Sequence, residues 1–403
     1  MLQSYVNIFQ CMQDLNIELL NEYTKLYNKT QLILFLKKKY GDCTPFVAEQ
    51  LALIEKSKKK LPEWYAQGCF FTKKSLEQSS SIPLAKYKAS LLKGDLLIDL
   101  SAGLGVDDVA FSNTFNRVIG VDVDASLNTI VRHNYERLNI QNVTRVDATA
   151  EAFLIDSQIK ADTYYIDSDR RPSGSTKTFS LIGATPNVLE IYPALLGQGA
   201  EVLLKLSPMV DIAYLLNTFD HIKRLIVVGV KNEVKEVLLL LNSQATTDKS
   251  NIEAVQVNED GKVEFKFSQN PNEFIRVNNI DNHFFYEPSN MIIKAGLSYV
   301  YAKSCGLSIV SKNSHYATGG YIDGYFGRCF SVVNHFDFNK SGIKQYIKQH
   351  SISKANVSAR NFVSSVDEIR KSFNLEDGGD DYLFFTQDAA KNKLFWHCKK
   401  ISL

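Results

Sequence analysis

Residues 1–90 carry apolar positions at helical spacing. Leu32, Ile33, Phe35 and Leu36 lie on one side of such a helix, and the strict alternation that marks a half-buried strand is rare in this part of the chain. The pattern predicts a helical N-terminal region that spans residues 1–90.

The hydrophobic pattern changes at Leu96, where short apolar runs begin to alternate with stretches of helix length. Apolar strands without alternation are buried on both faces, and helices between them cover a mostly parallel sheet. The pattern predicts a doubly wound α/β domain over residues 91–270. The expected strands are Leu96–Leu100, Val118–Val121, Thr163–Ile166, Glu201–Leu204 and Leu225–Val228.

The end of this domain has a different pattern. Apolar and polar residues alternate in the stretch Asn251–Ser268, which predicts an antiparallel hairpin at the edge of the sheet. After Asn270 the density of Asn, Pro and Gly rises, and this indicates a domain boundary. The remainder mixes strand and helix patterns, so we expect a small α+β domain at the C-terminus.

Composition adds little to this picture except a local charge. Of the 403 residues, 45% are hydrophobic and 22% are charged, as in ordinary globular proteins, and the formal net charge is +2. From Tyr301 onward, 14 Lys and Arg face 9 Asp and Glu, an excess of five positive charges that suits a polyanionic partner. A second basic run, Lys56–Lys60, either contacts nucleic-acid phosphate or is a solvated helix end closed by Pro62.

The sequence predicts a cytoplasmic protein. Residues 1–20 are interrupted by polar and acidic side chains, so they do not form the apolar core of a signal peptide. The longest aliphatic runs, such as Val237–Leu241, are too short to cross a bilayer. Six scattered cysteines without a CxxC pair predict free, mostly buried thiols in a reducing compartment, and no metal site is expected.

Candidate chemistry begins where the first expected strand ends, at Asp99-Leu-Ser101-Ala-Gly103-Leu-Gly105-Val-Asp107. The two glycines allow a sharp turn and let a ligand approach the backbone closely. The third glycine of the dinucleotide fingerprint is replaced by Asp108, and Asp107 and Asp108 would repel a pyrophosphate at this helix N-terminus. S-adenosylmethionine has no phosphate and carries cationic groups, so the charge pattern favours it over a nicotinamide cofactor.

Acidic residues also end the next strands of the expected sheet. Asp122, followed by Val123, lies 23 residues after Asp99, close to the spacing at which an acid meets ribose hydroxyls. Asp147, followed by Ala148, can accept a bond from the adenine amine, and Asp167 ends the fourth strand. Ligands of open α/β sheets bind outside the carboxyl ends of the strands, so these acids predict one cofactor site.

Several motifs resemble those of bacterial class I S-adenosylmethionine-dependent methyltransferases with a C-terminal THUMP-like domain. The resemblance extends from about residue 30 to the end. It implies a Rossmann-like methyltransferase sheet, a small ferredoxin-like linker domain at 271–325 and a THUMP-like domain at 326–403. The motifs are, besides the glycine loop, Lys58–Trp64, Leu76–Ser80, Ala85–Lys88, Asp169–Arg171, Lys205–Met209 with Asp211, Ala359–Phe362, Ile369–Lys371 and Asp377–Gly379.

The resemblance also implies roles for residues outside the glycine loop. The segment Glu77-Gln78-Ser79-Ser80 covers the cofactor. A helix N-cap at Ser79 or Ser80 is the alternative, and it is compatible with the same role. Because THUMP domains bind RNA in tRNA-modifying enzymes, the implied substrate is RNA, with tRNA a candidate. In the fourth-strand motif, Asp169 replaces a residue that is usually not acidic in this family.

Methyl transfer from a sulfonium needs mainly an aligned nucleophile and a way out for any proton that it carries. Asp167 and Asp169 are the candidate catalytic residues, although Asp167 could instead cap a turn. Arg170 and Arg171 could bind a substrate phosphate or carboxylate, or pair with nearby acids. Lys205 and Ser207 follow the fifth strand and could contact substrate. A protein or metabolite substrate, or a cofactor-binding module without turnover, remain alternatives.

Overall fold

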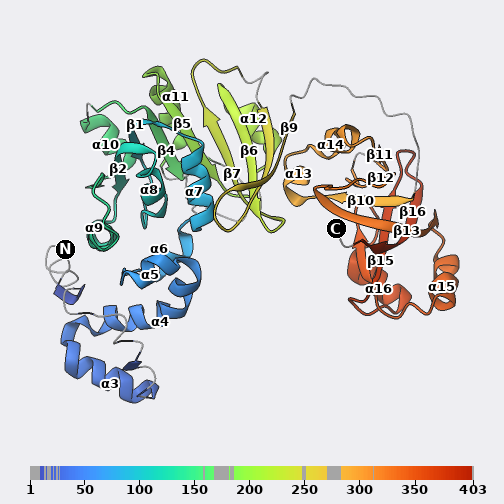
Figure 1. The fold of residues 1–403 in the computed structure, drawn as a ribbon, viewed down its shortest axis with the longest axis horizontal. Helices are drawn as coiled ribbons and strands as arrows, with labels where there is room; N and C mark the ends of the chain where they lie inside the picture. The colour runs from blue at the N-terminus through green and yellow to red at the C-terminus, as the bar shows by residue number, and fades with distance from the viewer. Residues whose placement is uncertain are drawn as a thin grey trace. The chain divides into compact units, whose positions relative to one another are not determined.

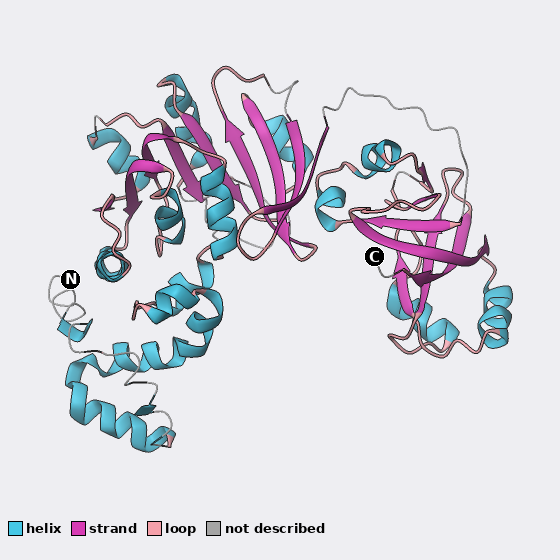
Figure 2. Cartoon of the chain, in the orientation of Figure 1, coloured by secondary structure: helices cyan, strands magenta, loops and turns pink. Residues whose placement is uncertain are grey.

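The computed structural model describes residues 10–12, 15, 20, 22, 23, 26, 28–157, 159–167, 181, 186–246, 251–269, 283–311 and 313–401. The chain forms two compact units, and the second comprises Ile226–Lys235, Asn251–Gln256 and the residues from Phe265 onward. Helices dominate the chain before the first sheet, and strands dominate the second unit (Figure 1, Figure 2). None of the described helices has the length and apolarity needed to cross a membrane.

The N-terminal region is helical, as the sequence predicted. Apolar side chains of these helices form a core with Phe70 and Ile130, and Asn134 fixes the strand-like segment at Phe70 by bonding its backbone N–H and C=O. This core attaches the region to the sheet domain. Its elements are α3 (Lys29–Tyr40), a 3-10 turn (Gly41–Cys43), α4 (Thr44–Lys60), α5 (Pro62–Ala66), α6 (Lys73–Gln78) and α7 (Ile82–Ser90).

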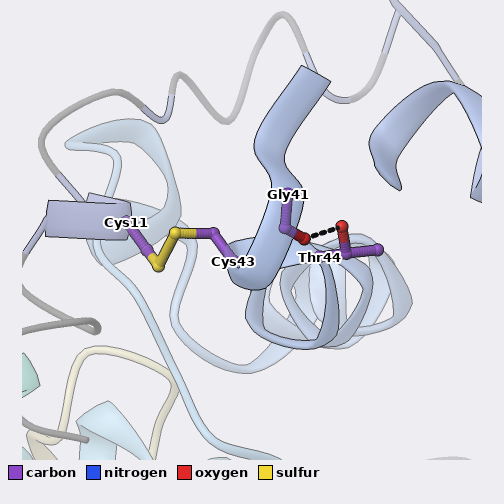
Figure 3. Close-up of a disulfide and its surroundings, with 4 residues drawn as sticks. All are labelled: Cys11, Gly41, Cys43 and Thr44. Atoms are coloured by element: carbon purple, nitrogen blue, oxygen red, sulfur yellow. Dashed lines mark hydrogen bonds between the residues drawn. A yellow bond between two sulfur atoms is a disulfide. The ribbon is translucent and has the colours of Figure 1, made fainter. Parts of the chain in front are cut away.

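Two of the six cysteines do not have the state expected from the sequence. Cys11 and Cys43 form a disulfide that joins the first described turn to the 3-10 turn before α4 (Figure 3). The expectation that all cysteines are free thiols is therefore wrong for this pair. Cys69, Cys305, Cys329 and Cys398 are free.

A nine-stranded sheet follows, in the order β3-β2-β1-β4-β5-β7-β6-β8-β9. The first five strands in this order are parallel, which confirms the doubly wound α/β class. The strand order reverses between β1 and β4, and ligands of such sheets bind at this switch point. The strands are β1 (Gly94–Asp99), β2 (Phe115–Asp122), β3 (Val143–Asp147), β4 (Thr163–Asp167), β5 (Glu201–Leu206), β6 (Ile222–Val230), β7 (Glu233–Leu241), β8 (Asn251–Val257) and β9 (Val263–Gln269).

Helices connect the parallel strands. They are α8 (Val106–Phe111), α9 (Ala125–Arg137), α10 (Ala150–Asp156), α11 (Val188–Gly197) and α12 (Ile212–Thr218). The aliphatic run Val237–Leu241 belongs to β7, which is antiparallel to β5. The two-residue turn between β6 and β7 has positive φ at Lys231 and Asn232, the combination that a tight hairpin requires. The hairpin expected over Asn251–Ser268 is confirmed as β8 and β9 at the edge of the sheet.

A seven-stranded sheet, β11-β12-β10-β13-β16-β15-β14, forms the frame of the second unit. Strand β10 pairs with β13 through five residue pairs, so one sheet crosses the boundary expected at residue 325. Its elements are β10 (Phe284–Pro288), α13 (Asn290–Lys294), α14 (Ser298–Ser304), β11 (Ser308–Ile309), β12 (Ala317–Gly319), β13 (Gly327–Asp337), α15 (Lys340–Gln349), β14 (Asn356–Ala359), α16 (Val366–Phe373), β15 (Asp381–Gln387) and β16 (Lys393–Lys400).

This continuity predicts how fragments behave. Phe285 and Tyr316 pack with Phe330, Phe384 and Trp396 in one buried core, so a fragment of residues 326–403 lacks part of that core and the β10 edge. We expect fragment 283–403 to unfold cooperatively in urea, followed by circular dichroism, and fragment 326–403 to show no cooperative transition. A cooperative transition in the shorter fragment would show that residues 326–403 fold alone.

Candidate functional site

The parallel register gathers the expected acids at one edge of the first sheet. Asp122 pairs with Asp147 across β2 and β3, and Asp167 pairs with Lys205 across β4 and β5. Asp99 ends β1 between these two pairs of strands. The structure therefore brings together the strand-end residues that the sequence predicted, at the edge where such sheets bind ligands.

The glycine loop runs from β1 to α8, and its two glycines have different functions. Both have positive φ, +49° at Gly103 and +80° at Gly105. A Cβ atom added at Gly105 would lie 2.1 Å from the Tyr135 hydroxyl, whereas one added at Gly103 would meet only the Ser101 carbonyl, at 3.8 Å. The protein itself therefore requires glycine at 105. Space remains beside Gly103, where a ligand can approach the backbone.

Asp108 does not offer its charge to a ligand at the helix N-terminus, contrary to the expectation from the sequence. Its side chain is completely buried and accepts hydrogen bonds from Arg145 at 2.9 Å and from the Tyr135 hydroxyl at 2.8 Å. Arg145 also binds the Gly103 carbonyl and Asn128. The pair thus supports the glycine loop from inside the protein.

Asp99 and Ser101 join the ends of two strands. Asp99 is buried and accepts bonds from the Ser101 N–H and hydroxyl, while the Asp167 N–H donates to the Ser101 hydroxyl at 2.6 Å. Burial and the nearby Asp108 carboxylate raise the pKa of Asp99 well above its ordinary value. Asp99 therefore shapes the loop as a buried hydrogen-bond acceptor for Ser101.

Asp107 belongs to a second buried cluster of charges. Its Oδ2 accepts hydrogen bonds from Ser80 at 2.7 Å and from the Tyr165 hydroxyl at 3.0 Å, and its Oδ1 lies 3.1 Å from the Lys88 ammonium. Lys88 also contacts Glu236 on β7 at 3.1 Å. Burial alone would raise the pKa of Asp107, but the positive charges nearby, chiefly Lys88, lower it below its ordinary value. Asp107 is therefore ionised.

The second strand ends at a bound and partly exposed carboxylate. Asp122 accepts the Gly103 N–H at 2.9 Å and the Asp124 N–H at 2.8 Å, so it fixes the glycine loop against β2. The adjoining Val123 is 69% exposed, an apolar surface beside the strand ends. A carboxylate and an apolar side chain therefore lie next to each other at the end of β2.

The third strand ends in a carboxylate, Asp147, that already has two hydrogen-bond donors. Asp147 Oδ1 accepts hydrogen bonds from Asn128 at 2.8 Å and Arg132 at 2.6 Å, and the Asp147 side chain is 42% exposed. The Ala148 N–H donates to the Asp122 carbonyl at 3.2 Å. An adenine at this position would meet a carboxylate whose orientation is already set.

The fourth and fifth strands end in an ion pair. Asp167 and Lys205 bond directly to each other, and about a third of the Asp167 side chain stays exposed. Ser207 follows and accepts the Met209 N–H through its hydroxyl at 3.2 Å. The other expected catalytic and substrate residues, Asp169, Arg170 and Arg171, lie outside the described residues.

The segment before α7 differs from its expected form. Glu77 pairs with Lys56 at 2.7 Å. Ser79 follows the C-terminus of α6, where its hydroxyl donates to the Leu76 carbonyl. The N-cap of α7 is Ser81, so neither Ser79 nor Ser80 is a helix N-cap. Gln78 is exposed at the end of the same helix. Ser80 points to Asp107, so this segment is fixed to the charged cluster.

Lys60 is not a free member of the basic run Lys56–Lys60. Its ammonium binds the Leu76 and Glu77 carbonyls at the end of α6. Burial, followed by the charges of Lys56 and Lys205, lowers the pKa of Lys60 to about 8. The interpretation of this run as a plain phosphate-binding surface is therefore wrong at Lys60, which closes a helix.

Four residues of the site were not predicted as site residues: Lys88, Arg145, Tyr165 and Glu236. Two of them left a signal in the sequence. Lys88 interrupts the apolar residues of α7, and Glu236 directly precedes the run Val237–Leu241, so each places a charge inside an apolar element. The described residues include no group of three or more His, Cys, Asp or Glu arranged to bind a metal ion.

Known proteins share these features. Residues 327–400 match the family described as THUMP domain-like. The chain is 21% identical over 358 residues to an uncharacterized S-adenosylmethionine-dependent methyltransferase of Mycobacterium tuberculosis. The aligned region spans 84% of this chain and 92% of that relative. A crystal structure from Porphyromonas gingivalis W83, whose assignment as a methyltransferase is itself inferred, aligns with a TM-score of 0.78 and 26% identity over 93% of this chain and 100% of that one.

These similarities confirm the resemblance that the sequence motifs indicated. They confirm the α/β fold with its helical N-terminal region, a THUMP-like C-terminal part, the methyltransferase class and S-adenosylmethionine as its cofactor. The strand-end carboxylates and the open side of Gly103 lie at the edge where such a cofactor is expected.

The different functions of the two glycines can be tested by Gly103→Ala and Gly105→Ala. We expect Gly103→Ala to weaken S-adenosylmethionine binding at least tenfold, because its methyl group occupies the space beside the loop, and to cost about 1 kcal/mol of stability from its positive φ. Gly105→Ala should cost roughly 1–3 kcal/mol or more, through strain and the clash with Tyr135. Titration calorimetry and urea unfolding measure both effects. Unchanged donor affinity in Gly103→Ala would place the ligand elsewhere.

Proposed function

We propose that this S-adenosylmethionine-dependent methyltransferase modifies RNA, with tRNA as the first candidate. The observation that carries the proposal is the match of residues 327–400 to the THUMP domain-like family, on the same chain as a methyltransferase domain. THUMP domains proper bind RNA, so the C-terminal unit would hold the acceptor while the first sheet holds the methyl donor. We further propose that the enzyme acts in the cytoplasm.

The described residues divide between these two tasks. In this proposal the donor lies against the backbone at Gly103, and its ribose and adenine are held at the ends of β2 and β3. The residues there are Asp122, Val123, Asp147 and Ala148. Asp99, Ser101, Gly105 and Asp107 shape that pocket from inside, and the segment Glu77–Ser79 borders it.

Asp167 is the proposed catalytic residue. Its partly exposed carboxylate lies at the strand end beside the donor site, so it can orient the acceptor atom and accept a proton from it. Lys205 pairs with this carboxylate and fixes its direction, and Ser207 follows on the same edge. Asp169, Arg170 and Arg171 come directly after β4 in the chain, and we assign them to the acceptor.

A basic helix in the C-terminal unit offers a surface for the RNA backbone. Lys340, Lys344 and Lys348 lie four residues apart on α15, all are exposed, and the helix contains no acidic residue. Ile343 and Ile347 on its other face pack into the core. Successive lysines are separated by about 6 Å along the axis, given the ~1.5 Å rise per residue of a helix. Such a row of cations can contact successive phosphates.

The two roles at the donor edge can be separated by Asp167→Ala and Asp122→Ala. We expect Asp167→Ala to keep donor affinity within a few-fold and to lower turnover by ~10²–10⁴-fold, as lost acid–base or positioning groups do. Asp122→Ala should weaken the donor first, because it releases the Gly103 N–H. Calorimetry gives the affinities and single-turnover kinetics the rates. Equal loss of donor binding in both variants would assign Asp167 to the cofactor pocket.

The RNA proposal is tested by incubating the protein with labelled donor and separate cell fractions of tRNA, other RNA, protein and small molecules. We expect label in RNA, and we expect replacement of Lys340, Lys344 and Lys348 by Gln to weaken tRNA binding. For three phosphate contacts to a single strand, the slope of log affinity against log salt should fall by up to about 2. Gel shifts at several salt concentrations measure it.

A charge-matched control replaces three lysines that already form ion pairs, Lys223 with Glu201, Lys235 with Glu233 and Lys354 with Glu376. This variant loses the same net charge but should keep the slope. Label in the protein or small-molecule fraction alone would contradict an RNA substrate, and equal slopes in both variants would remove α15 from the RNA surface.

A further inference from the structure

The cluster around Lys88 contains charged side chains from three separate elements at the donor edge, together with the Ser80 hydroxyl. The Lys88 ammonium on α7 contacts the Ser80 hydroxyl at 2.8 Å, Asp107 Oδ1 at 3.1 Å and both Glu236 oxygens at 3.1 and 3.2 Å. Asp107 begins α8 directly after the glycine loop, and Glu236 lies on β7. The three charged side chains are nearly or completely buried, so water does not screen them.

The adjoining pair Asp167 and Lys205 extends this cluster. The charge of Lys205 acts on Asp107 and Glu236 as well as on Asp167. With these five groups ionised, three carboxylates face two ammonium groups, a net charge of −1. The Lys60 ammonium acts on Lys205 from outside this group and is bonded to the Leu76 and Glu77 carbonyls. In addition, Asp107 Oδ1 is buried, and its one charged neighbour at short distance among the described residues is the Lys88 ammonium, at 3.1 Å.

We propose that Glu236 is a specificity-determining residue that makes the donor site prefer the positively charged S-adenosylmethionine to its neutral demethylated product. The donor carries a sulfonium, an ammonium and a carboxylate, a net charge of +1. In the reaction the S–CH₃ bond breaks, its electron pair stays on sulfur, and the methyl group bonds to the acceptor. The product, S-adenosylhomocysteine, therefore has no net charge.

The excess negative charge acts differently on the two ligands. It attracts the positively charged donor. The product has no net charge after the methyl group has left, so the cluster does not attract it. The same cluster therefore favours both donor binding and product release. The effect belongs to Glu236 because Asp167 has Lys205 as its own partner, whereas Asp107 and Glu236 share Lys88. The inference concerns the donor, and it holds for any methyl acceptor.

The replacement Glu236→Gln removes the excess charge and keeps the shape, but it exchanges one of the two oxygens that contact Lys88 for an amide NH₂ group. We expect the Kd of S-adenosylmethionine to rise about tenfold, the effect of one charge roughly 12 Å away at an effective dielectric of about 20. The Kd of S-adenosylhomocysteine should stay within about twofold. Calorimetry with both ligands gives their ratio, which a purely structural role would not change.

Glu253→Gln is the matched control. Glu253 is completely buried on β8 of the same sheet and has a counterion of its own, Lys266 at 2.8 Å. This variant loses the same charge and should keep the ratio of the two affinities. If Glu236→Gln weakens both ligands equally, or neither, the inference is wrong.

A second measurement needs no variant and remains available if Glu236→Gln does not fold. Burial raises the pKa of Glu236, against the opposing charges of Lys88 and Lys205, with Asp107 and Tyr165 also facing it. As the pH falls, Glu236 therefore loses its charge before an ordinary glutamate does. In the wild-type protein, the affinity for S-adenosylmethionine should therefore fall relative to the affinity for S-adenosylhomocysteine as the pH is lowered. A ratio that is constant between pH 8 and about 4.5, the ordinary value for glutamate, would overturn the proposal.

Discussion

The burial of the Lys88 ammonium is the constraint on which the donor edge depends. A buried charge without partners costs several kcal/mol, and breaking a buried pair costs about 3–5 kcal/mol. Lys88 is completely buried and takes its partners from the Ser80 segment, from α8 and from β7. Asp107 and Glu236 are far apart in the sequence. Their common cation therefore holds together the segment before β1, the helix α8 after the glycine loop and the antiparallel strand β7.

The sequence predicted the strands of the parallel sheet well, because a strand buried on both faces appears as an uninterrupted apolar run. It did not predict β7, whose polar first half contains Glu236, since a charge paired inside the protein resembles an exposed one in the sequence. The sheet that joins β10 to β13 was also missed, because pairing between distant segments leaves no local pattern. The disulfide has the same origin: Cys11 and Cys43 are 32 residues apart, and only folding brings them together.

The candidate site was predicted in place but not in function. Parallel strands end at one edge, so the acids at the ends of β1 to β4 could be located from their strands alone. Their charge states could not, because these depend on partners such as Arg145 for Asp108 and Lys88 for Asp107. Asp99 was predicted as a cofactor ligand; in the structure it is buried and accepts hydrogen bonds from Ser101, and burial together with the Asp108 carboxylate raises its pKa.

This changes the physical reason for which the site selects a cationic cofactor. The sequence attributed the selection to two acidic residues at the start of α8, but Arg145 neutralises Asp108 inside the protein. The charge that can act on a ligand comes instead from the cluster of Asp107, Glu236 and Lys88 beside the loop. There a pyrophosphate would meet an excess negative charge in a weakly screened environment, whereas a sulfonium or ammonium group would balance it. The preference therefore depends on how many ammonium groups the fold buries with these carboxylates, and not on the number of acids in the loop.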